Sequence, residues 1–436
     1  MIRLISVLLI GTIVSFYFFP FEFVFFPGVN TKMALAGIGL VLLGIELARQ
    51  RESKIRRDLL VLSFIAAIVS FMCYFAVIYN NTNDYTYVSY IISMWVWLGG
   101  AYTAGKCIKA LHGFVTVKLV CDYLIGVCVA QCIIALLIDT YEPIRAFVNS
   151  IVIGFDFVDI GRLNKSGRLY GIGASLDVAG TRFAAVLLMI AYWVQKDTKK
   201  QVWYLLAYMT IALVGNMIGR TTTVGMLMGI CYWIYNSICN KNNPKDELKK
   251  FWKRLALIVL GVIPLIVSCY IYVPKMYDNI RFAFEGFFSL VEKGKWDVVS
   301  NKMLEKMIVF PETTKTWVIG DGYFENPYKD PYYTNQDYKG IRAGGYYMET
   351  DIGYLRFIFY MGLTGLIAFC YFFYRVGKNC MDRFSQHKMM FLMILVLHFA
   401  IWCKVSTDIF VVFALFLCIP NNDERVYNDE RVTMSD

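Results

Sequence analysis

Four arginines in three separate segments have the chemistry to bind phosphate. Arg220 is the only charged side chain in residues 201–240, within the apolar stretch VGNMIGRTTTVGMLMG. Arg162 and Arg168 occur in GRLNKSGRLYGIG, and Arg342 occurs in KGIRAGG. A guanidinium keeps its charge and presents several N–H donors in one plane, which suits phosphate oxygens. We therefore expect these residues to bind a diphosphate or an anionic lipid headgroup. For Arg220 the alternative is snorkelling to the membrane interface.

The composition is that of a membrane protein. The 436 residues are 58% hydrophobic and 17% charged, whereas a soluble domain is about 25% charged. Apolar runs recur that are long enough to cross a hydrocarbon core about 30 Å thick as helices. We predict an all-α integral membrane protein, a single polytopic domain over 1–436, with about twelve spanning helices. The predicted spans are 4–19, 33–48, 59–78, 87–104, 119–138, 182–196, 202–218, 222–239, 255–273, 351–374, 388–403 and 408–420.

The basic residues behind the net charge of +10 are placed as in the loops of a membrane protein, and they do not indicate a surface that binds nucleic acid. Basic clusters occur in alternate loops, within 49–57, 106–118, 196–200, 241–254 and 375–388. All of them fall on one side, which the positive-inside rule makes cytoplasmic, with both termini inside. The opposite, exoplasmic side then receives two long loops, 139–181 and 274–350. Residues 421–436 are a predicted cytoplasmic tail.

The cysteines do not form a pattern that binds metal. None of the twelve lies in either long loop, and no CxxC pair or other metal-ligand spacing occurs. We therefore expect no disulfide framework, no metal site and no cofactor.

The second long loop begins with a helical pattern. Ile280, Phe284, Phe287, Phe288 and Val291 recur at steps of three and four residues, which predicts a helical stripe. Such a stripe is expected at the membrane interface or against the ends of the spanning helices.

From Trp317 onward the same loop is rich in glycine, proline, asparagine and tyrosine. Tyr346 and Tyr347, together with Tyr354 just beyond the loop, are candidates for stacking on sugar rings. The alternative is that a folded loop uses these aromatic rings for its own core.

Three segments resemble the O-antigen polymerases and O-antigen ligases of bacterial cell envelopes. GNMIGRTTT is similar to that family's Ser/Gly-Arg-Thr turn, and SGRLYGIGASLDVAGTRFA to its arginine-bearing segment. TDIGYLRFIFYMGLTGLI resembles the segment that enters the helix after the large periplasmic loop. Arg-x10-Gly spacings, which are also described for polymerases, occur once in each long loop, at 162–173 and 342–353.

The resemblance implies a glycosyltransferase C-like fold in the bacterial inner membrane and a polymerase active on its periplasmic face without a metal. The expected partners are undecaprenyl-diphosphate-linked oligosaccharides, membrane lipids and a chain-length regulator protein. Nucleic acid is not an expected partner. One lipid diphosphate would leave the anomeric carbon while a hydroxyl of another repeat unit attacks. Arg162, Arg168, Arg220 and Arg342 would bind the diphosphate, and Arg220 would also stabilise the charge that develops on its bridging oxygen.

The attacking hydroxyl needs a base, and general-base help is worth about 10² to 10⁴ in rate. In the resembled ligases a histidine lies three residues before the tyrosine of a Tyr-Leu pair, and the matching residue here is Asp351. Asp351 is therefore the candidate base, and Glu349 is the alternative. Asp351 could instead cap the helix that is predicted to begin there.

Other functions were weighed against polymerisation. An O-antigen ligase would share this chemistry and differ in its acceptor, a lipid A core. A lipid-linked oligosaccharide flippase or other transporter belongs to another class, but such proteins often show internal repeats and bind near the bilayer midplane, and no repeat is evident here. Mannosyltransferase-type enzymes generally carry an acidic pair in the first outer loop, where residues 20–32 offer only Glu22.

Overall fold

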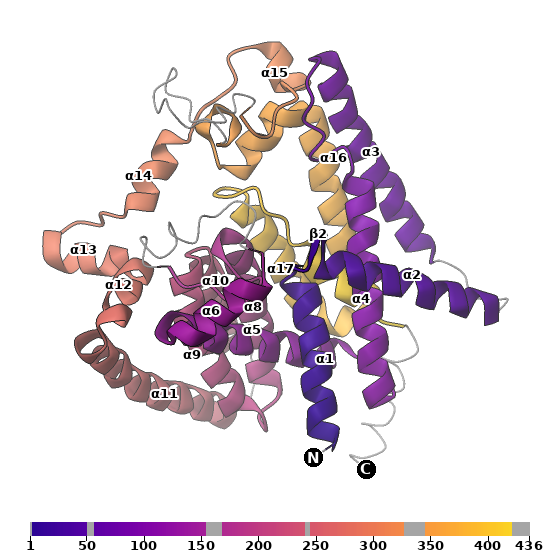
Figure 1. Ribbon diagram of the computed structural model, residues 1–436. Coiled ribbons are helices and arrows are strands. Elements are labelled where there is room, and N and C mark those ends of the chain that lie inside the picture. Colours follow the sequence, from indigo (N-terminus) through magenta and orange to yellow (C-terminus); the bar gives the residue numbers. More distant parts are fainter. Residues whose placement is uncertain (1, 50–55, 154–167, 240–244, 327–344, 421–436) are drawn as a thin grey trace. The chain divides into compact units, whose positions relative to one another are not determined.

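The computed structural model is mostly helical (Figure 1), and its contacts divide the chain into two compact units. The structure describes residues 2–49, 56–153, 168–239, 245–326 and 345–420. The first unit comprises Met1–Leu42, Leu98–Trp296 and Ala414–Asp436, and the second comprises Leu43–Trp97 and Asp297–Phe413. The single domain over 1–436 stays a prediction.

Every predicted span overlaps a helix of the structure. These helices are α1 (Ile2–Phe18), α2 (Thr31–Arg49), α3 (Arg57–Tyr79), α4 (Tyr90–His112), α5 (Val117–Thr140), α8 (Leu176–Lys196), α9 (Gln201–Ile218), α10 (Thr222–Cys239), α11 (Lys245–Tyr272), α16 (Gly353–Arg383), α17 (Lys388–Ile401) and α18 (Phe410–Leu417). In the described ranges, seven helices are long and apolar enough to cross a membrane: α2, α3, α5, α8, α9, α11 and α16. The protein is therefore a helical multi-pass membrane protein. The total of twelve spans and their orientation stay predictions.

The segments between these helices contain further structure. A small hairpin of β1 (Glu22–Phe23) and β2 (Phe26–Asn30) separates α1 from α2, so the chain is not entirely helical. The shorter helices are α6 (Glu142–Ile151), α12 (Pro274–Ala283), α13 (Glu285–Lys293), α14 (Val299–Lys306), α15 (Thr314–Val318), η1 (Tyr347–Glu349) and η2 (Ser385–His387). The stripe predicted around 280–291 is helical, but it is two helices that break at Phe284, not one.

The first unit is built around α8, whose residues Ala179–Val194 are all buried. It packs against α5, α9 and α10 (Figure 1). A Cβ at Gly225 of α10 would lie 2.3 Å from the Cα of Ala184 in α8. Glycine is therefore needed where these two helices cross, because small residues let helix backbones approach closely in membrane proteins.

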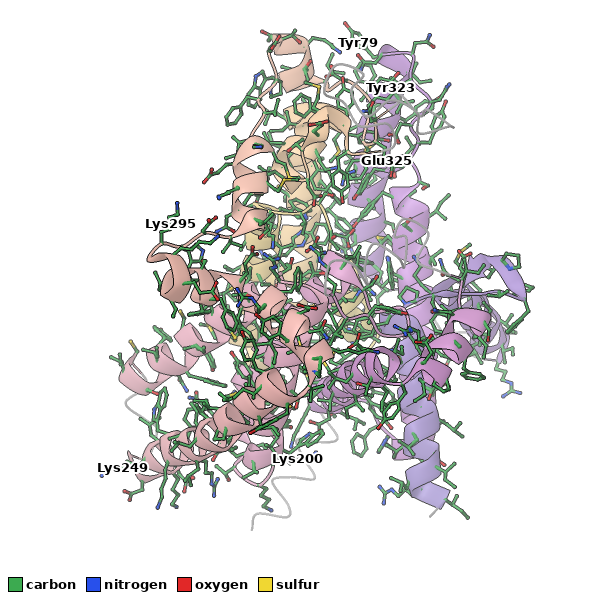
Figure 2. All side chains as sticks on the ribbon, turned by 60° about the vertical axis from the view of Figure 1, so that its left-hand side comes forward. Tyr79, Lys200, Lys249, Lys295, Tyr323 and Glu325 are labelled. Carbon is green, nitrogen blue, oxygen red and sulfur yellow. The ribbon has the colours of Figure 1, made fainter. Side chains whose placement is uncertain are left out.

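Two labelled lysines of the first unit bear on the predicted topology. Figure 2 shows Lys200 and Lys249 at the same end of this unit, while Lys295, from the second long loop, lies away from that end. Lys200 and Lys249 are thus placed as one membrane side would require.

The second unit is built around α16, which packs against α3, α15 and α17. The helix is interrupted at Gly362, whose backbone has φ 66° and ψ −179°. The carbonyls of Phe359 and Tyr360 instead accept the N–H groups of Asp321 and Gly322. The interruption of the helix is thus satisfied by the loop that follows α15, because buried backbone groups must find partners.

The same loop is also held by the turn between α3 and α4. Thr82 Oγ1 donates to the carbonyl of Gly322 at 2.8 Å, and Asp84 Oδ2 accepts from the backbone N–H of Phe324 at 2.8 Å. In each pair the two residues are 240 positions apart in sequence. The loop therefore joins the α3–α4 turn to the interrupted part of α16.

Candidate anion-binding site

Arg220 lies in the tight turn between α9 and α10, in the first unit. A Cβ at Gly219 would lie 2.3 Å from the carbonyl oxygen of Leu176, so the approach of this turn to the start of α8 requires glycine. Thr221 Oγ1 donates to Asp177 Oδ1 of α8 at 2.8 Å. The residues on both sides of Arg220 thus contact α8, which fixes the position of the backbone that carries the guanidinium.

Arg168 is brought to the same place by the backbone of its own segment. The N–H of Leu169 donates to the carbonyl of Met217, near the end of α9, at 3.1 Å. The guanidinium carbons of Arg168 and Arg220 lie 4.8 Å and 4.1 Å from the centroid of the Phe282 ring. Two guanidiniums from separate segments therefore contact one aromatic ring, as cation–π pairs do.

Carboxylates lie close to both guanidiniums of this site. Burial lowers the pKa of Arg168, Asp177 opposes this shift, and the nearby positive charge of Arg220 adds to it. An arginine stays protonated despite such a shift. Arg220 Nη1 donates to Glu285 Oε2 at 2.6 Å, and the two side chains are 17% and 25% exposed. The site thus holds two cations close together, with a protein carboxylate on one of them.

Phe282 and Glu285 flank the break between α12 and α13, and the sequence analysis did not single them out. Arg281 forms a bidentate ion pair with Glu292, with N–O distances of 2.7 and 2.8 Å, which ties α12 to α13. Such fork-like pairs have a defined geometry. At the other side, α12 packs against α9, and Asn279 donates to Asp139 Oδ2 at 3.1 Å near the end of α5. The break is therefore held in place beside the arginines.

Of the four predicted diphosphate-binding residues, the structure brings Arg168 and Arg220 together. Arg162 and Arg342 lie outside the described residues.

The candidate bases lie in the second unit, before α16. Asp351 does not cap this helix: the N-cap residue is Ile352, and no side-chain hydrogen bond is made there. The N-cap position that the capping alternative gave to Asp351 is thus occupied by Ile352. Instead, Asp351 Oδ1 lies 3.8 Å from Nη1 of Arg356. Glu349 is exposed, and both Met348 and Glu349 adopt left-handed backbone, with φ of 53° and 55°. Consecutive non-glycine residues in this region are strained, a feature that clusters at functional sites.

Arg356 is the main residue of this region that the sequence analysis missed. Its side chain is 5% exposed. The guanidinium carbon lies 3.5 Å from the ring centroid of Phe324 and 4.1 Å from that of Tyr346. Nη1 donates to Ser406 Oγ at 2.7 Å, and Nη2 to the carbonyl of Phe324 at 3.0 Å. A signal was present, because a charge near the start of an apolar helix requires partners.

The three candidate sugar-binding tyrosines all take part in the packing of the second unit. Tyr346 remains 42% exposed. The ring of Tyr347 lies 5.4 Å from that of Tyr323, which Figure 2 labels beside Glu325. The hydroxyl of Tyr354 donates to the carbonyl of Phe399 at 2.9 Å. Tyr346 thus has the most surface open to a ligand, whereas Tyr354 already uses its polar group within the fold.

No protein-family model, curated protein or solved structure matches the chain. Within the ranges described, no group of three or more His, Cys, Asp and Glu side chains is placed to hold a metal ion. The candidate site of the first unit is defined by the two guanidiniums, of Arg168 and Arg220, that contact Phe282.

Proposed function

We propose that the protein is a membrane glycosyltransferase that joins oligosaccharide repeat units carried on undecaprenyl diphosphate, at the periplasmic face of a bacterial inner membrane. The observation that supports this proposal is the contact of both Arg168 and Arg220 with the ring of Phe282. A diphosphate offers two adjacent phosphates to two adjacent guanidiniums. The α9–α10 turn joins two apolar helices, which is where the headgroup of a lipid substrate would lie.

In the proposed reaction, the hydroxyl oxygen of the acceptor unit bonds to the anomeric carbon of the donor. The bond from that carbon to the diphosphate oxygen breaks, and the lipid diphosphate leaves with the electron pair. The hydroxyl proton passes to a carboxylate base, for which Asp351 is the candidate. Arg168 and Arg220 would stabilise the negative charge that develops on the leaving group, an effect that is largest where water is excluded.

Lysine substitutions test this proposal, because lysine keeps the charge and loses the fork of donors. We expect Arg168→Lys and Arg220→Lys each to weaken binding of undecaprenyl diphosphate to the purified protein by about 10- to 150-fold, the equivalent of a lost charge-assisted hydrogen bond worth roughly 1.5–3 kcal/mol. Each should also abolish or shorten surface polysaccharide in a host that lacks the wild-type gene.

Arg145→Lys is the matched control. Arg145 belongs to the same predicted outer loop as Arg168 and pairs with Glu142 within α6. Its replacement should therefore leave both the binding of undecaprenyl diphosphate and the surface polysaccharide unchanged. Normal polymer and normal binding in Arg220→Lys would mean that this arginine only reaches for the membrane interface, and the proposal would fail.

A further inference from the structure

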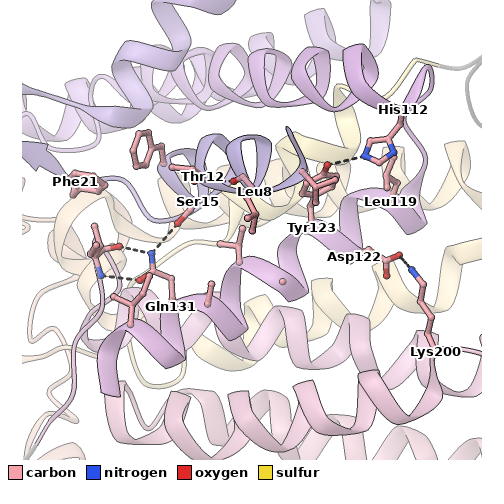
Figure 3. Close-up of a pocket in the computed structure, with 18 residues that line it drawn as sticks. Leu8, Thr12, Ser15, Phe21, His112, Leu119, Asp122, Tyr123, Gln131 and Lys200 are labelled. Atoms are coloured by element: carbon pink, nitrogen blue, oxygen red, sulfur yellow. Dashed lines mark hydrogen bonds and ion pairs between the residues drawn. The ribbon is translucent and has the colours of Figure 1, made fainter. Parts of the chain in front are cut away.

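A furrow between α1 and α5 of the first unit has the form of a hydrocarbon-binding site (Figure 3). Its volume is about 510 Å³. Gly11 of α1 and both Gly126 and Ala130 of α5 line it, and these small residues leave the space between the helices. Along α5 the lining runs from Leu119 to Ile134, which is about 22 Å at a rise of 1.5 Å per residue. The furrow is thus long and narrow, like an extended lipid chain.

The polar groups in the furrow wall already have partners. Thr12 Oγ1 donates to the carbonyl of Leu8 at 3.0 Å. Gln131 Nε2 donates to Ser15 Oγ at 3.0 Å and to the carbonyl of Ile172 at 2.9 Å, and its Oε1 accepts from the N–H of Ile172 at 3.0 Å. Because this wall offers few unmet hydrogen bonds, water gains little there, and apolar cavities stay dry. Hydrocarbon is the occupant that such a surface favours.

The furrow continues into the outward face of α1. Leu8 lines the furrow and is 62% exposed, and its neighbour Leu9 is 61% exposed. Exposed leucines on an apolar helix of a membrane protein face the lipid. A lipid chain could therefore enter the furrow sideways from the bilayer.

One end of the furrow carries charge. Figure 3 shows His112, Asp122 and Lys200 at this end, with Gln131 toward the other. Lys200 Nζ lies 2.7 Å from Asp122 Oδ2. Partial burial and then the positive charge of Arg3 lower the pKa of His112, so this imidazole is neutral at pH 7. Lys200 pairs with Asp122 and Lys118 with Asp197, so Arg3, whose charge acts on His112, leaves a net positive charge here that suits an anionic headgroup.

We propose that this furrow binds one acyl chain of an anionic glycerophospholipid, whose phosphate lies at the end marked by Arg3 and Lys200. The phosphate of this resident lipid is not that of the diphosphate substrate, because the charged end of the furrow and the diphosphate site lie toward opposite ends of α5. Lys200 pairs with Asp122, near the start of α5. The helix that carries Phe282 is held instead by Asp139, near the end of α5. The inference therefore does not rest on the proposed function.

The furrow can be filled without disturbing the fold. A Cβ at Gly11 or at Gly126 would meet no other atom within 4 Å, and leucine has a higher helix propensity than glycine. We therefore choose Gly11→Leu, Gly126→Leu and the double variant. Gly261→Leu on α11 is the matched control, because a Cβ there also meets nothing within 4 Å and Gly261 lies outside the furrow.

The measurement is native mass spectrometry of the delipidated full-length protein with added dioleoyl phosphatidylglycerol. We expect wild type and Gly261→Leu to retain one phosphatidylglycerol more tightly than phosphatidylcholine. Gly126→Leu and the double variant should lose at least about tenfold in affinity, since about 1.4 kcal/mol of lost burial has this effect. Arg3→Gln should reduce the preference for phosphatidylglycerol over phosphatidylcholine.

Three outcomes would overturn the proposal. The first is equal retention of phosphatidylglycerol by wild type and by both single variants. The second is equal affinity of the wild type for phosphatidylglycerol and phosphatidylcholine. The third is displacement of bound phosphatidylglycerol by equimolar undecaprenyl phosphate in wild type, which would make the furrow a site for the polyprenyl chain.

Discussion

In the structure, the carboxylate of Glu285 pairs with the guanidinium of Arg220. A bound diphosphate would have to displace this carboxylate. The carboxylate accepts from the guanidinium at 2.6 Å. If phosphate oxygens take its place, binding in the wild type includes the loss of this ion pair and the approach of a second negative charge. We therefore predict that Glu285→Gln binds the diphosphate more tightly than the wild type, although it removes a native contact.

The size of the effect follows from the burial of the pair. With side chains 17% and 25% exposed, the contact is a partly screened, charge-assisted hydrogen bond worth about 1.5–3 kcal/mol. Glutamine still accepts a hydrogen bond, so the substitution removes roughly half of this interaction energy. Displacing the side chain then costs less by that half, and the affinity for diphosphate should rise by about 3- to 15-fold. The free protein should become less stable by the same amount, roughly 0.75–1.5 kcal/mol.

The assay is titration of the purified protein in detergent micelles with undecaprenyl diphosphate at a fixed ionic strength, because exposed charges are screened by salt. Glu142→Gln is the control. Its carboxylate pairs with Arg145 within α6 and does not hold α12 or α13, so its removal should leave diphosphate affinity unchanged.

The reasoning fails if Glu285→Gln binds diphosphate with unchanged or weaker affinity while the control behaves as wild type. Glu285 would then support the position of Arg220 and would not compete with the ligand.

Two further predictions concern the second unit. Asp351→Asn should be folded in the membrane and make no polymer, because an amide cannot accept the hydroxyl proton, whereas Glu349→Gln should remain active; full polymerisation by Asp351→Asn excludes this residue as the essential base. Gly362→Ala should lower the stability of the protein by about 2 kcal/mol or more, because its backbone region is open essentially to glycine alone and a Cβ would lie 2.1 Å from the carbonyl oxygen of Val318. Thermal unfolding in micelles measures this loss against Gly261→Ala, and equal melting temperatures for the two variants would contradict it.

Hydrophobic pattern predicted where the helices lie, but not where they break. The stripe from Ile280 to Val291 has the period of one helix, yet Phe284 leaves helical geometry, with φ −116° and ψ 27°. The period of apolar residues in a sequence indicates which face of a helix is apolar. It does not indicate where packing against other segments interrupts the helix. This break places Phe282 and Glu285 beside Arg220, so the same omission hid two residues of the site.

The arginines show the same limit from another side. Arg168 and Arg220 could be selected from sequence because each stands out against an apolar or loop background. Arg356 is likewise a charge near the start of an apolar helix, but its partners Phe324, Tyr346 and Ser406 could not be read from the sequence. Phe324 and Ser406 lie 32 and 50 positions from Arg356 in the sequence, and no local spacing encodes their meeting.

The hydrogen bonds between the α3–α4 turn and the loop after α15 also constrain how the protein is made. The hydrogen bond between Asp84 and Phe324 cannot form until Phe324, 240 residues later, has been synthesised. At 5–20 residues per second, a ribosome needs about 12–48 s to add these residues. During that interval α5 to α11 of the first unit emerge, while the segment Leu43–Trp97 has no second half to pack against. The second unit can thus fold only late in synthesis, through contacts between segments that are distant in sequence. Such folding is slow because the distant segments must first meet. Its early half depends on the membrane or on other proteins to remain unaggregated until synthesis is nearly complete.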